Sequence, residues 1–270
     1  MKIDELAKHA NNIRREIIEM SYRANGGHIG CSLDIVDILT VLYFEIMNIN
    51  PRNPSMKKRD KLILSKGHAA SALYAVLAER GYFNGDRLKE FMADGSLLAA
   101  HVTLGSLPGI EATSGSLGHG LSVGIGMAVA ARQEKTNANT YVLIGDGEAC
   151  EGSIWEGILF AGFHKINDLT LIMDKNDLQI LGKSADVLDL SPIEKKLTSF
   201  NWAVQKVDGH NFKELIRALH KPHQGKPMAI IAQTVKGKGV SFMENKYEWH
   251  GKTLTFDDYQ KAITELSSHL

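Results

Sequence analysis

The sequence predicts an α/β fold, a mostly parallel sheet flanked by helices. The first indication is an apolar, β-branched run at residues 140–144 that ends in Gly-Asp-Gly at 145–147. The second is another apolar run at 169–173, which is followed closely by Asn176. The third is the segment between them, 151–165, whose apolar residues recur at helical spacing. Strand, helix and strand over this length form a βαβ unit, whose strands are parallel and whose crossover is right-handed. The predicted apolar helix face consists of Ile154, Trp155, Ile158, Leu159 and Phe163.

The other elements follow from the same patterns, taken along the chain. A helix is expected over 4–23, with Leu6, Ile13, Ile17 and Met20 on its apolar face. The further helical segments and strands are then read from periodicity and from Gly, Asn and Pro at their ends. The expected helices are 33–47, 69–80, 120–132, 211–219 and 255–266, with loop and helix over 186–200, and the expected strands are 61–64, 202–207 and 228–234. The Gly- and Ala-rich composition of 120–132 permits another element to approach that helix closely. No linker or internal repeat interrupts this pattern, so one domain is expected over residues 1–270.

The bulk composition narrows the class of protein. Lys plus Arg and Asp plus Glu both number 31, and this balance argues against an electrostatic nucleic-acid binder. The most apolar stretch, around 123–131, is too short and too rich in glycine to span a bilayer. Acidic residues stand near the N-terminus where a signal peptide would be basic, and the two cysteines do not suggest a disulfide framework. We therefore expect a cytoplasmic enzyme.

Two polar residues mark the predicted sheet edge. Asp146 and Asn176 each lie just past the carboxyl end of a predicted strand, on the edge where open α/β sheets bind ligands. One carboxylate and one amide oxygen suit Mg²⁺, which completes its coordination with phosphate and water. The N-terminus of the following helix favours anions, so the sequence predicts a seat for a divalent metal and a diphosphate. The same residues would also serve as an ordinary turn and a strand terminator.

Several sequence motifs together resemble those of the transketolase family, whose members bind thiamine diphosphate. Gly-Asp-Gly followed after about thirty residues by Asn is the thiamine-diphosphate motif, here extended as Gly-Asp-Gly-Glu-Ala-Cys-Glu-Gly at 145–152. Three earlier strings agree in order and spacing: Gly-Gly-His-Ile-Gly at 26–30, Leu-Ser-Lys-Gly-His-Ala at 64–69 and Gly-Ser-Leu-Gly-His-Gly at 115–120. Two later segments, 235–239 and 249–251, are also similar to the family. The resemblance covers nearly the whole chain.

The resemblance implies a cofactor, thiamine diphosphate with Mg²⁺, and a set of residues that hold it. Asp146 and Asn176 would bind the metal through their side chains, and Leu178 through its carbonyl. Lys66 and Lys236 would add positive charge at the diphosphate, although each would also serve as a solvated surface lysine. The implied cofactor-binding residues are Lys66, His68, Gly115, Leu117, Gly145, Asp146, Gly147, Glu151, Asn176, Ile180, Lys236 and His250. Leu181 stands where the family often has aspartate, which removes a polar side chain but no implied metal ligand.

The resemblance also implies which residues act on the substrate. His28 and His250 would bind the oxygens of the substrate's C1 and C2 atoms and assist proton transfer, a task that suits imidazole near neutral pH. His68 and His101 would line the same pocket, although the residues around His101 differ from the family's usual sequence. His119 replaces a common glutamine and is expected to be only a neighbour. Glu151 and Glu156 match glutamates that link two active sites in the family dimer, and they would equally suit the first turn of a helix.

The matched strings belong to one domain of the family's three. The glutamate that activates the cofactor and the arginines that hold sugar phosphates lie in the other domains, so the chain resembles the N-terminal subunit of a split transketolase. A separate C-terminal subunit is the expected partner, in an α2β2 assembly that transfers a two-carbon ketol unit between sugar phosphates, by default those of the pentose phosphate pathway. Two alternatives remain open. One is a subunit of another thiamine-diphosphate enzyme, of the 2-oxoacid dehydrogenase α or deoxyxylulose-phosphate synthase type; the other is a non-catalytic cofactor-binding protein.

Overall fold

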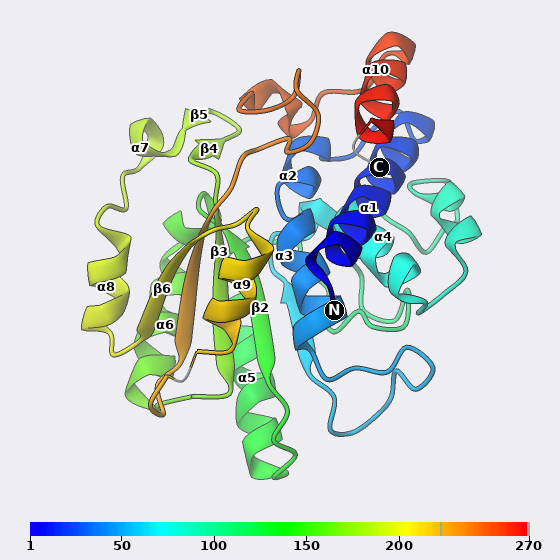
Figure 1. The fold of residues 1–270 in the computed structure, drawn as a ribbon. Coiled ribbons are helices and arrows are strands. Elements are labelled where there is room, and N and C mark those ends of the chain that lie inside the picture. Colours follow the sequence, from blue (N-terminus) through cyan, green and yellow to red (C-terminus); the bar gives the residue numbers. More distant parts are fainter. Residues whose placement is uncertain (222, 269–270) are drawn as a thin grey trace.

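A parallel sheet forms the centre of the molecule, and helices cover both of its faces (Figure 1). The computed structural model describes residues 1–221 and 223–268. Within these residues the main sheet has five strands in the order β1-β2-β3-β7-β6, and every neighbouring pair is parallel. The strands are β1 (Lys61–Leu64), β2 (Thr140–Gly145), β3 (Leu169–Lys175), β6 (Ala203–Asp208) and β7 (Met228–Gln233), with a small antiparallel pair of β4 (Leu178–Gln179) and β5 (Gly182–Lys183) beside them. This arrangement confirms the predicted fold class.

The helices follow the predicted segments closely, with one difference. The α-helices are α1 (Ile3–Arg23), α2 (Ile29–Leu33), α3 (Val36–Val41), α4 (Ala70–Arg80), α5 (Gly120–Gln133), α6 (Gly152–Phe163), α7 (Ser184–Val187), α8 (Ile193–Ser199), α9 (Phe212–Leu219) and α10 (Phe256–Ser267). Short 3-10 or π-helical turns are η1 (Leu42–Ile46), η2 (Gly67–Ala69), η3 (Gly85–Glu90), η4 (Glu148–Cys150) and η5 (Tyr247–His250). The single helix expected over 33–47 is instead α3 and η1, and the short helix α2 precedes them. The chain leaves α2 at Asp34, whose carboxylate turns inward to buried polar partners.

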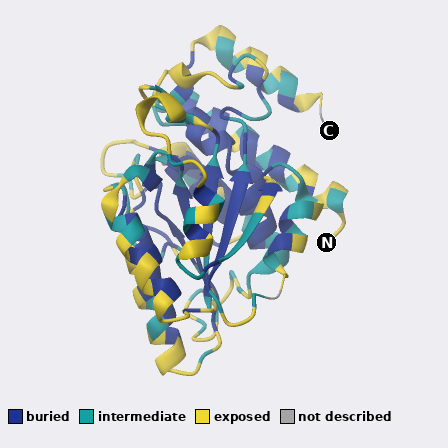
Figure 2. Cartoon of the chain, turned by 90° about the vertical axis from the view of Figure 1, so that its left-hand side faces the viewer, coloured by how far each residue is buried: buried dark blue, intermediate teal, exposed yellow. Residues whose placement is uncertain are grey.

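Alternate strand residues face two separate cores. On one face, Leu62, Leu143 and Ile230 pack with α1, α2, α3, α4, α9 and α10. On the other face, Val142 and Ile231 pack with α5, α6 and α8. Strands buried on both sides in this way are typical of parallel sheets covered by crossover helices. Figure 2 shows the strands as a buried layer between helices whose outer faces are exposed.

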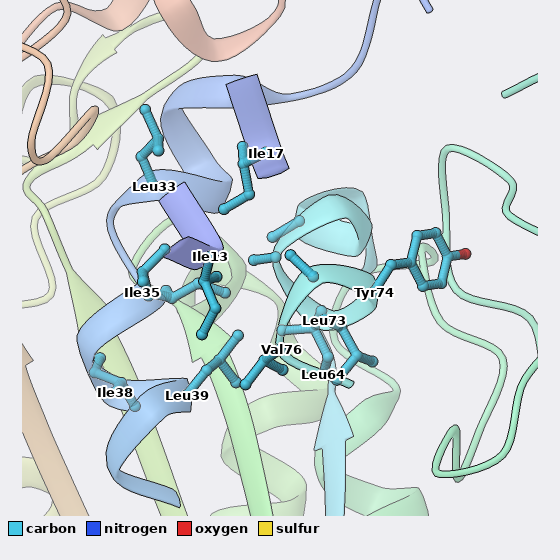
Figure 3. Close-up of a cluster of buried hydrophobic side chains, with 14 of the residues drawn as sticks. Ile13, Ile17, Leu33, Ile35, Ile38, Leu39, Leu64, Leu73, Tyr74 and Val76 are labelled. Atoms are coloured by element: carbon cyan, nitrogen blue, oxygen red, sulfur yellow. The ribbon is translucent and has the colours of Figure 1, made fainter. Parts of the chain in front are cut away.

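The first core is built around α1 and α4, which contact each other and α3. Figure 3 shows Ile13 and Ile17 of α1 beside Leu33 of α2 and Leu73 of α4, above the end of β1. All four side chains are at most 2% exposed. Burying an aliphatic side chain of this size contributes about 1.5–3 kcal/mol, so this cluster holds α2, and with it the residues that flank α2, firmly against the sheet.

Helix α5 lies unusually close to the sheet, as its composition predicts. A Cβ atom on Gly124 would come within 2.3 Å of Val142 Cγ2, a distance that no real contact adopts. Helix α6 differs from the prediction on one point: Leu159 and Phe163 are 55% and 77% exposed, whereas Ile154 and Ile158 are buried. The reason is rotational, because Leu159 and Phe163 lie on a second apolar face of α6 that the described chain leaves uncovered.

None of the helices in the described residues combines the length and the apolar character needed to cross a membrane.

Candidate active site

Asp146 and Asn176 meet at the carboxyl edge of the sheet. In the β2–β3 register Gly145 stands opposite Asp174, so the residues that follow the two strands emerge side by side. The Asp146 carboxylate accepts hydrogen bonds from the Gly147 N–H at 2.8 Å, the Asp177 N–H at 2.8 Å and the Ser184 hydroxyl at 2.9 Å. Burial, and then the charge of Asp174, raise the pKa of Asp146 to about 6. Within the described part of the chain this carboxylate forms no ion pair, which is the condition that a metal ion relieves.

The amide of Asn176 is oriented by buried carboxylates beneath it. Its Nδ2 atom donates to Asp34 Oδ2 at 3.0 Å and to Asp174 Oδ2 at 3.1 Å. The opposite atom, Oδ1, accepts the Leu178 N–H at 3.0 Å. Because the amide nitrogen is committed to two acceptors, the oxygen is turned toward the loop that follows β3.

A buried ion-pair network supports this amide. The Lys66 ammonium pairs with Asp34 at 3.2 Å and with Asp174, and all three side chains are at most 2% exposed. Although burial alone would lower it, the pKa of Lys66 is raised by Asp174 and Asp34. Burial would likewise raise the pKa of Asp174, but Lys66 lowers it. Lys236 is also buried, so neither lysine is a solvated surface residue.

Glu148 ties three loops of the site together. Its carboxylate accepts hydrogen bonds from the Ser65 hydroxyl, from the Gly118 N–H at 2.9 Å and from the Gly145 N–H at 3.4 Å. The residue is 2% exposed. Ser65 follows β1, Gly118 lies in the turn before α5, and Gly145 ends β2. This one carboxylate therefore holds three segments together that are far apart in the chain.

Two glycines shape the floor of the site in opposite ways. A Cβ atom on Gly145 would meet nothing within 4 Å among the described residues, so its backbone borders open space. Gly115 adopts φ +141°, and a Cβ atom there would lie 2.9 Å from His101 Cδ2. Gly145 therefore leaves room for a ligand against the backbone, whereas Gly115 allows the close approach of an imidazole.

Four histidines gather above this floor. The ring centroid of His28 lies 5.3 Å from His68, 5.6 Å from His101 and 5.3 Å from His250. Burial and His250 lower the pKa of His28 to about 4, burial and Lys66 lower that of His68 to about 2, and burial and Lys236 lower that of His250 to about 4. These three imidazoles are therefore neutral near pH 7. The Nδ1 atom of His28 is buried and has no hydrogen-bond partner among the described residues.

These groups open onto one cavity of about 390 Å³. The predicted site residues that line it are His28, Lys66, His68, His101, Gly115, Leu117, Gly145, Asp146, Gly147, Glu151, Asn176, Leu178, Ile180, Lys236 and His250. Glu156 does not line it and lies exposed on α6. His119 is the exposed residue that precedes the first turn of α5, which fits the expectation of a mere neighbour. A cavity lined by the predicted oxygen ligands and by neutral imidazoles suits a ligand with an anionic end and a reacting end.

Five residues of the site escaped the sequence reasoning: Cys31, Asp34, Glu148, Asp174 and Gln179. Asp174 lies near the carboxyl end of β3, Asp34 lies in a predicted helical region, Cys31 lies just before that region, and Glu148 sits in a turn. The one signal available for them was position, because Asp174 and Glu148 are each two residues from a predicted metal ligand.

Comparison with known proteins agrees with this geometry. Residues 6–269 match the family described as transketolase, thiamine diphosphate binding domain. An apulose-4-phosphate transketolase subunit of Phocaeicola vulgatus is 40% identical over 100% of this chain and 96% of its own length. The 6-deoxy-6-sulfo-D-fructose transketolase subunit SqwG of a Clostridium species is 42% identical over 97% of this chain and 96% of its own length.

Among solved structures, the transketolase of Campylobacter jejuni superposes with a TM-score of 0.92 at 32% identity. That match covers 99% of this chain but 43% of the larger protein. The chain is thus similar in length to the subunit-type relatives and corresponds to less than half of the long form.

Proposed function

The chain belongs to the transketolase family, and from that premise we propose that it is the diphosphate-binding subunit of a split transketolase, with residues 1–270 as one domain. On this proposal it transfers a two-carbon ketol unit from a ketose to an aldose together with a second subunit. The observation that carries the proposal is that the oxygen ligands Asp146 and Asn176 open onto the same cavity as four histidines.

The cavity fits thiamine diphosphate with Mg²⁺. Asp146, Asn176 and the Leu178 carbonyl offer oxygen donors alone, which is the ligand type that Mg²⁺ prefers. The open space beside Gly145 accommodates a diphosphate against the backbone. Lys236 supplies buried positive charge toward the same cavity, while Lys66 acts chiefly through the carboxylates that orient Asn176. Gly115, Leu117 and Ile180 line the part of the cavity assigned to the cofactor's ring system.

When bound, thiamine diphosphate supplies the nucleophilic carbon for ketol transfer, and this chain's histidines position the sugar around it. His28 and His250 hold the oxygens on the two carbons that are transferred, and His68 and His101 complete the wall. Because His28, His68 and His250 are neutral at pH 7, each can accept a proton from a hydroxyl group or donate one N–H to a carbonyl. The buried Nδ1 atom of His28 has no hydrogen-bond partner among the described residues, which leaves it one hydrogen bond to make.

A second subunit completes the site. Two relatives of similar length carry the word subunit in their names, which supports a partner for this chain. The uncovered apolar face of α6, with Leu159, Phe160 and Phe163 exposed by 46–77%, is the surface we assign to the contact between subunits in an α2β2 assembly. Glu151 at the cavity and Glu156 on the outside of α6 lie along the path from the site to that surface.

The substrate class is a ketose that carries an anionic group. One relative is named for apulose 4-phosphate and another for 6-deoxy-6-sulfo-D-fructose, so both phosphorylated and sulfonated ketoses belong in the test alongside pentose phosphates. The residues that recognise the anionic group are assigned to the partner.

The test is a ketol-transfer assay on the chain copurified with its partner, with Mg²⁺ and thiamine diphosphate added and products followed by mass spectrometry. We expect the two-subunit complex to extend an aldose by two carbons, the chain alone to be inactive, and an Asp146→Ala complex to lose both activity and cofactor binding. The control is Asp186→Ala, an exposed carboxylate on α7. Turnover by the chain alone, or cofactor affinity unchanged in Asp146→Ala, would refute the proposal.

A further inference from the structure

A thiol lies among the imidazoles of the cavity. Cys31 Sγ is 3.2 Å from His250 Nδ1 and 3.3 Å from Lys236 Nζ, and the residue is 2% exposed. This sulfur takes no part in the ketol transfer proposed for the cavity. Cys31 is thus a buried thiol in the histidine-lined part of the cavity, with no role in the chemistry proposed so far.

The backbone forces Cys31 and His250 together. The neighbouring residue Gly30 packs so tightly on the Trp249 carbonyl that a Cβ atom there would lie 2.9 Å from that oxygen. The Gly30 carbonyl also accepts the Gly237 N–H at 3.2 Å, which anchors α2 to the segment that carries Lys236. The contact between sulfur and imidazole therefore belongs to the packing of α2 against η5, and it does not depend on the rotamer of one loose side chain.

A third ligand atom completes the cluster. Ligand atoms of Cys31, His68 and His250 all lie within 4.8 Å of one another. In a tetrahedral zinc site, with bonds of about 2.0–2.3 Å, ligand atoms are about 3.3–3.8 Å apart, so a small closure of the side chains suffices. One thiolate with two imidazoles is a donor set for Zn²⁺ and similar thiophilic ions, whereas Mg²⁺ selects oxygen.

The cavity around the cluster admits such an ion, and the thiolate formed on binding offsets the charge of Lys236 beside it. A neutral imidazole presents the lone pair of one ring nitrogen to a metal ion. The cavity of about 390 Å³ gives the ion a route to the cluster and leaves space for water as a fourth ligand. His28 stands beside both imidazoles, with ring centroids 5.3 Å away, and its buried Nδ1 atom is unpartnered within the described chain. Lys236 can remain a hydrogen-bond donor to the bound sulfur.

We propose that Cys31, His68 and His250 form a binding site for a thiophilic divalent cation, Zn²⁺ above all, distinct from the oxygen ligands Asp146 and Asn176. Binding displaces the thiol proton and forms one S–Zn and two N–Zn bonds, with no change of oxidation state. The binding itself is independent of the proposed function. If that function holds, zinc occupies two histidines that the sugar needs, and the metal inhibits ketol transfer.

Cobalt is the probe, because Co²⁺ takes zinc sites and a thiolate ligand gives it a near-ultraviolet charge-transfer band. The full chain, reduced and free of cofactor, is titrated with Co²⁺ and then with Zn²⁺. We expect one thiolate-ligated Co²⁺ per chain, with absorption typical of tetrahedral geometry, that Zn²⁺ displaces. In Cys31→Ser the band disappears and Zn²⁺ affinity falls by at least about 100-fold, since even indirect partners of a metal contribute 10–100-fold.

Three variants make the test decisive. Cys150→Ser, the matched control at the chain's other cysteine, keeps the band, and Asp146→Ala keeps it as well. His68→Asn weakens Zn²⁺ binding while Cys31 remains in place, and circular dichroism confirms that each variant is folded. Absence of a thiolate band in the unaltered chain, its loss in Cys150→Ser or Asp146→Ala, or its persistence in Cys31→Ser would overturn the proposal. None of these readouts uses the partner, the cofactor or a sugar, so failure here is separate from failure of the proposed function.

Discussion

Replacing Lys66 by methionine tests whether the charges beneath the site are structural. The Lys66 ammonium pairs with Asp34 at 3.2 Å and with Asp174, and the side chains are 2%, 0% and 0% exposed. Methionine keeps much of the volume, so little cavity is created. The variant instead leaves two buried carboxylates without their ion-pair partner, and breaking a buried pair in this way costs about 3–5 kcal/mol.

Urea denaturation followed by circular dichroism measures this loss. In a domain of this size each kcal/mol corresponds to about 2–4 °C in the melting temperature, so a decrease of about 6–20 °C is expected in a thermal scan. Lys8→Met is the control, since Lys8 is an exposed residue of α1 and its replacement changes stability by about 0.5 kcal/mol at most. Adding Asp174→Asn to Lys66→Met removes the carboxylate charge whose pKa Lys66 lowers, and it recovers part of the loss.

The result separates two roles for Lys66. A Lys66→Met chain as stable as the Lys8→Met control, but with weakened cofactor affinity, would refute the argument that Lys66 chiefly neutralises Asp34 and Asp174. That result would instead support a direct contact between Lys66 and the diphosphate, which the family resemblance implies.

Three further predictions concern the same cavity. Burial and then Asp174 raise the pKa of Asp146 to about 6, so protons compete with Mg²⁺ for this carboxylate. Calorimetry should therefore show the cofactor affinity falling about tenfold per pH unit below 6. Constant affinity from pH 5 to 8 would contradict the assignment of Asp146 as a metal ligand. The stability of the metal-free chain depends on pH in the opposite direction from cofactor affinity. The folded state binds the Asp146 proton more tightly than the unfolded chain does. The contribution of Asp146 to the free energy of unfolding therefore decreases as the pH rises from about 4 to 6. Gly145→Ala should leave the melting temperature of the free chain nearly unchanged yet weaken cofactor binding. Gly67→Ala should destabilise the fold, because its Cβ atom would lie 2.6 Å from the Ser114 carbonyl carbon. Equal melting temperatures for the two variants would contradict this contrast. Glu148→Ala should lower the free energy of unfolding by about 2–4 kcal/mol in urea titrations, because buried donors lose their acceptor, and a loss under 1 kcal/mol would show that they find other partners.

Local patterns in the sequence were sufficient to predict the βαβ unit and the positions of its two proposed metal ligands. The runs at 140–144 and 169–173 are strands, the segment between them is a helix, and Asp146 and Asn176 follow the strand ends as predicted. Periodicity reports secondary structure because it depends on neighbours a few residues apart. Parallel pairing of consecutive strands then places both residues at one edge.

Only the tertiary structure decided which distant residues meet. The insertion of β7 between β3 and β6 sets Lys236 and the following loop beside the site, and strand order of this kind leaves no local signature. Glu148 reads in the sequence as one more acidic turn residue, yet it is the acceptor that joins the loops around it. The outward position of Leu159 and Phe163 on α6 was likewise hidden, because an apolar periodicity does not say whether the chain itself covers that face.

The sequence by itself determined the fold class, the Gly-Asp-Gly motif and the histidine-bearing motifs, since these are written in short segments. The contact of Cys31 with His250 spans 219 residues of chain and follows from the packing of α2 on η5, which only the folded molecule brings about. Contacts at such separation depend on how whole elements pack, and the free energy of that packing is spread over the two cores and not over any one stretch of sequence.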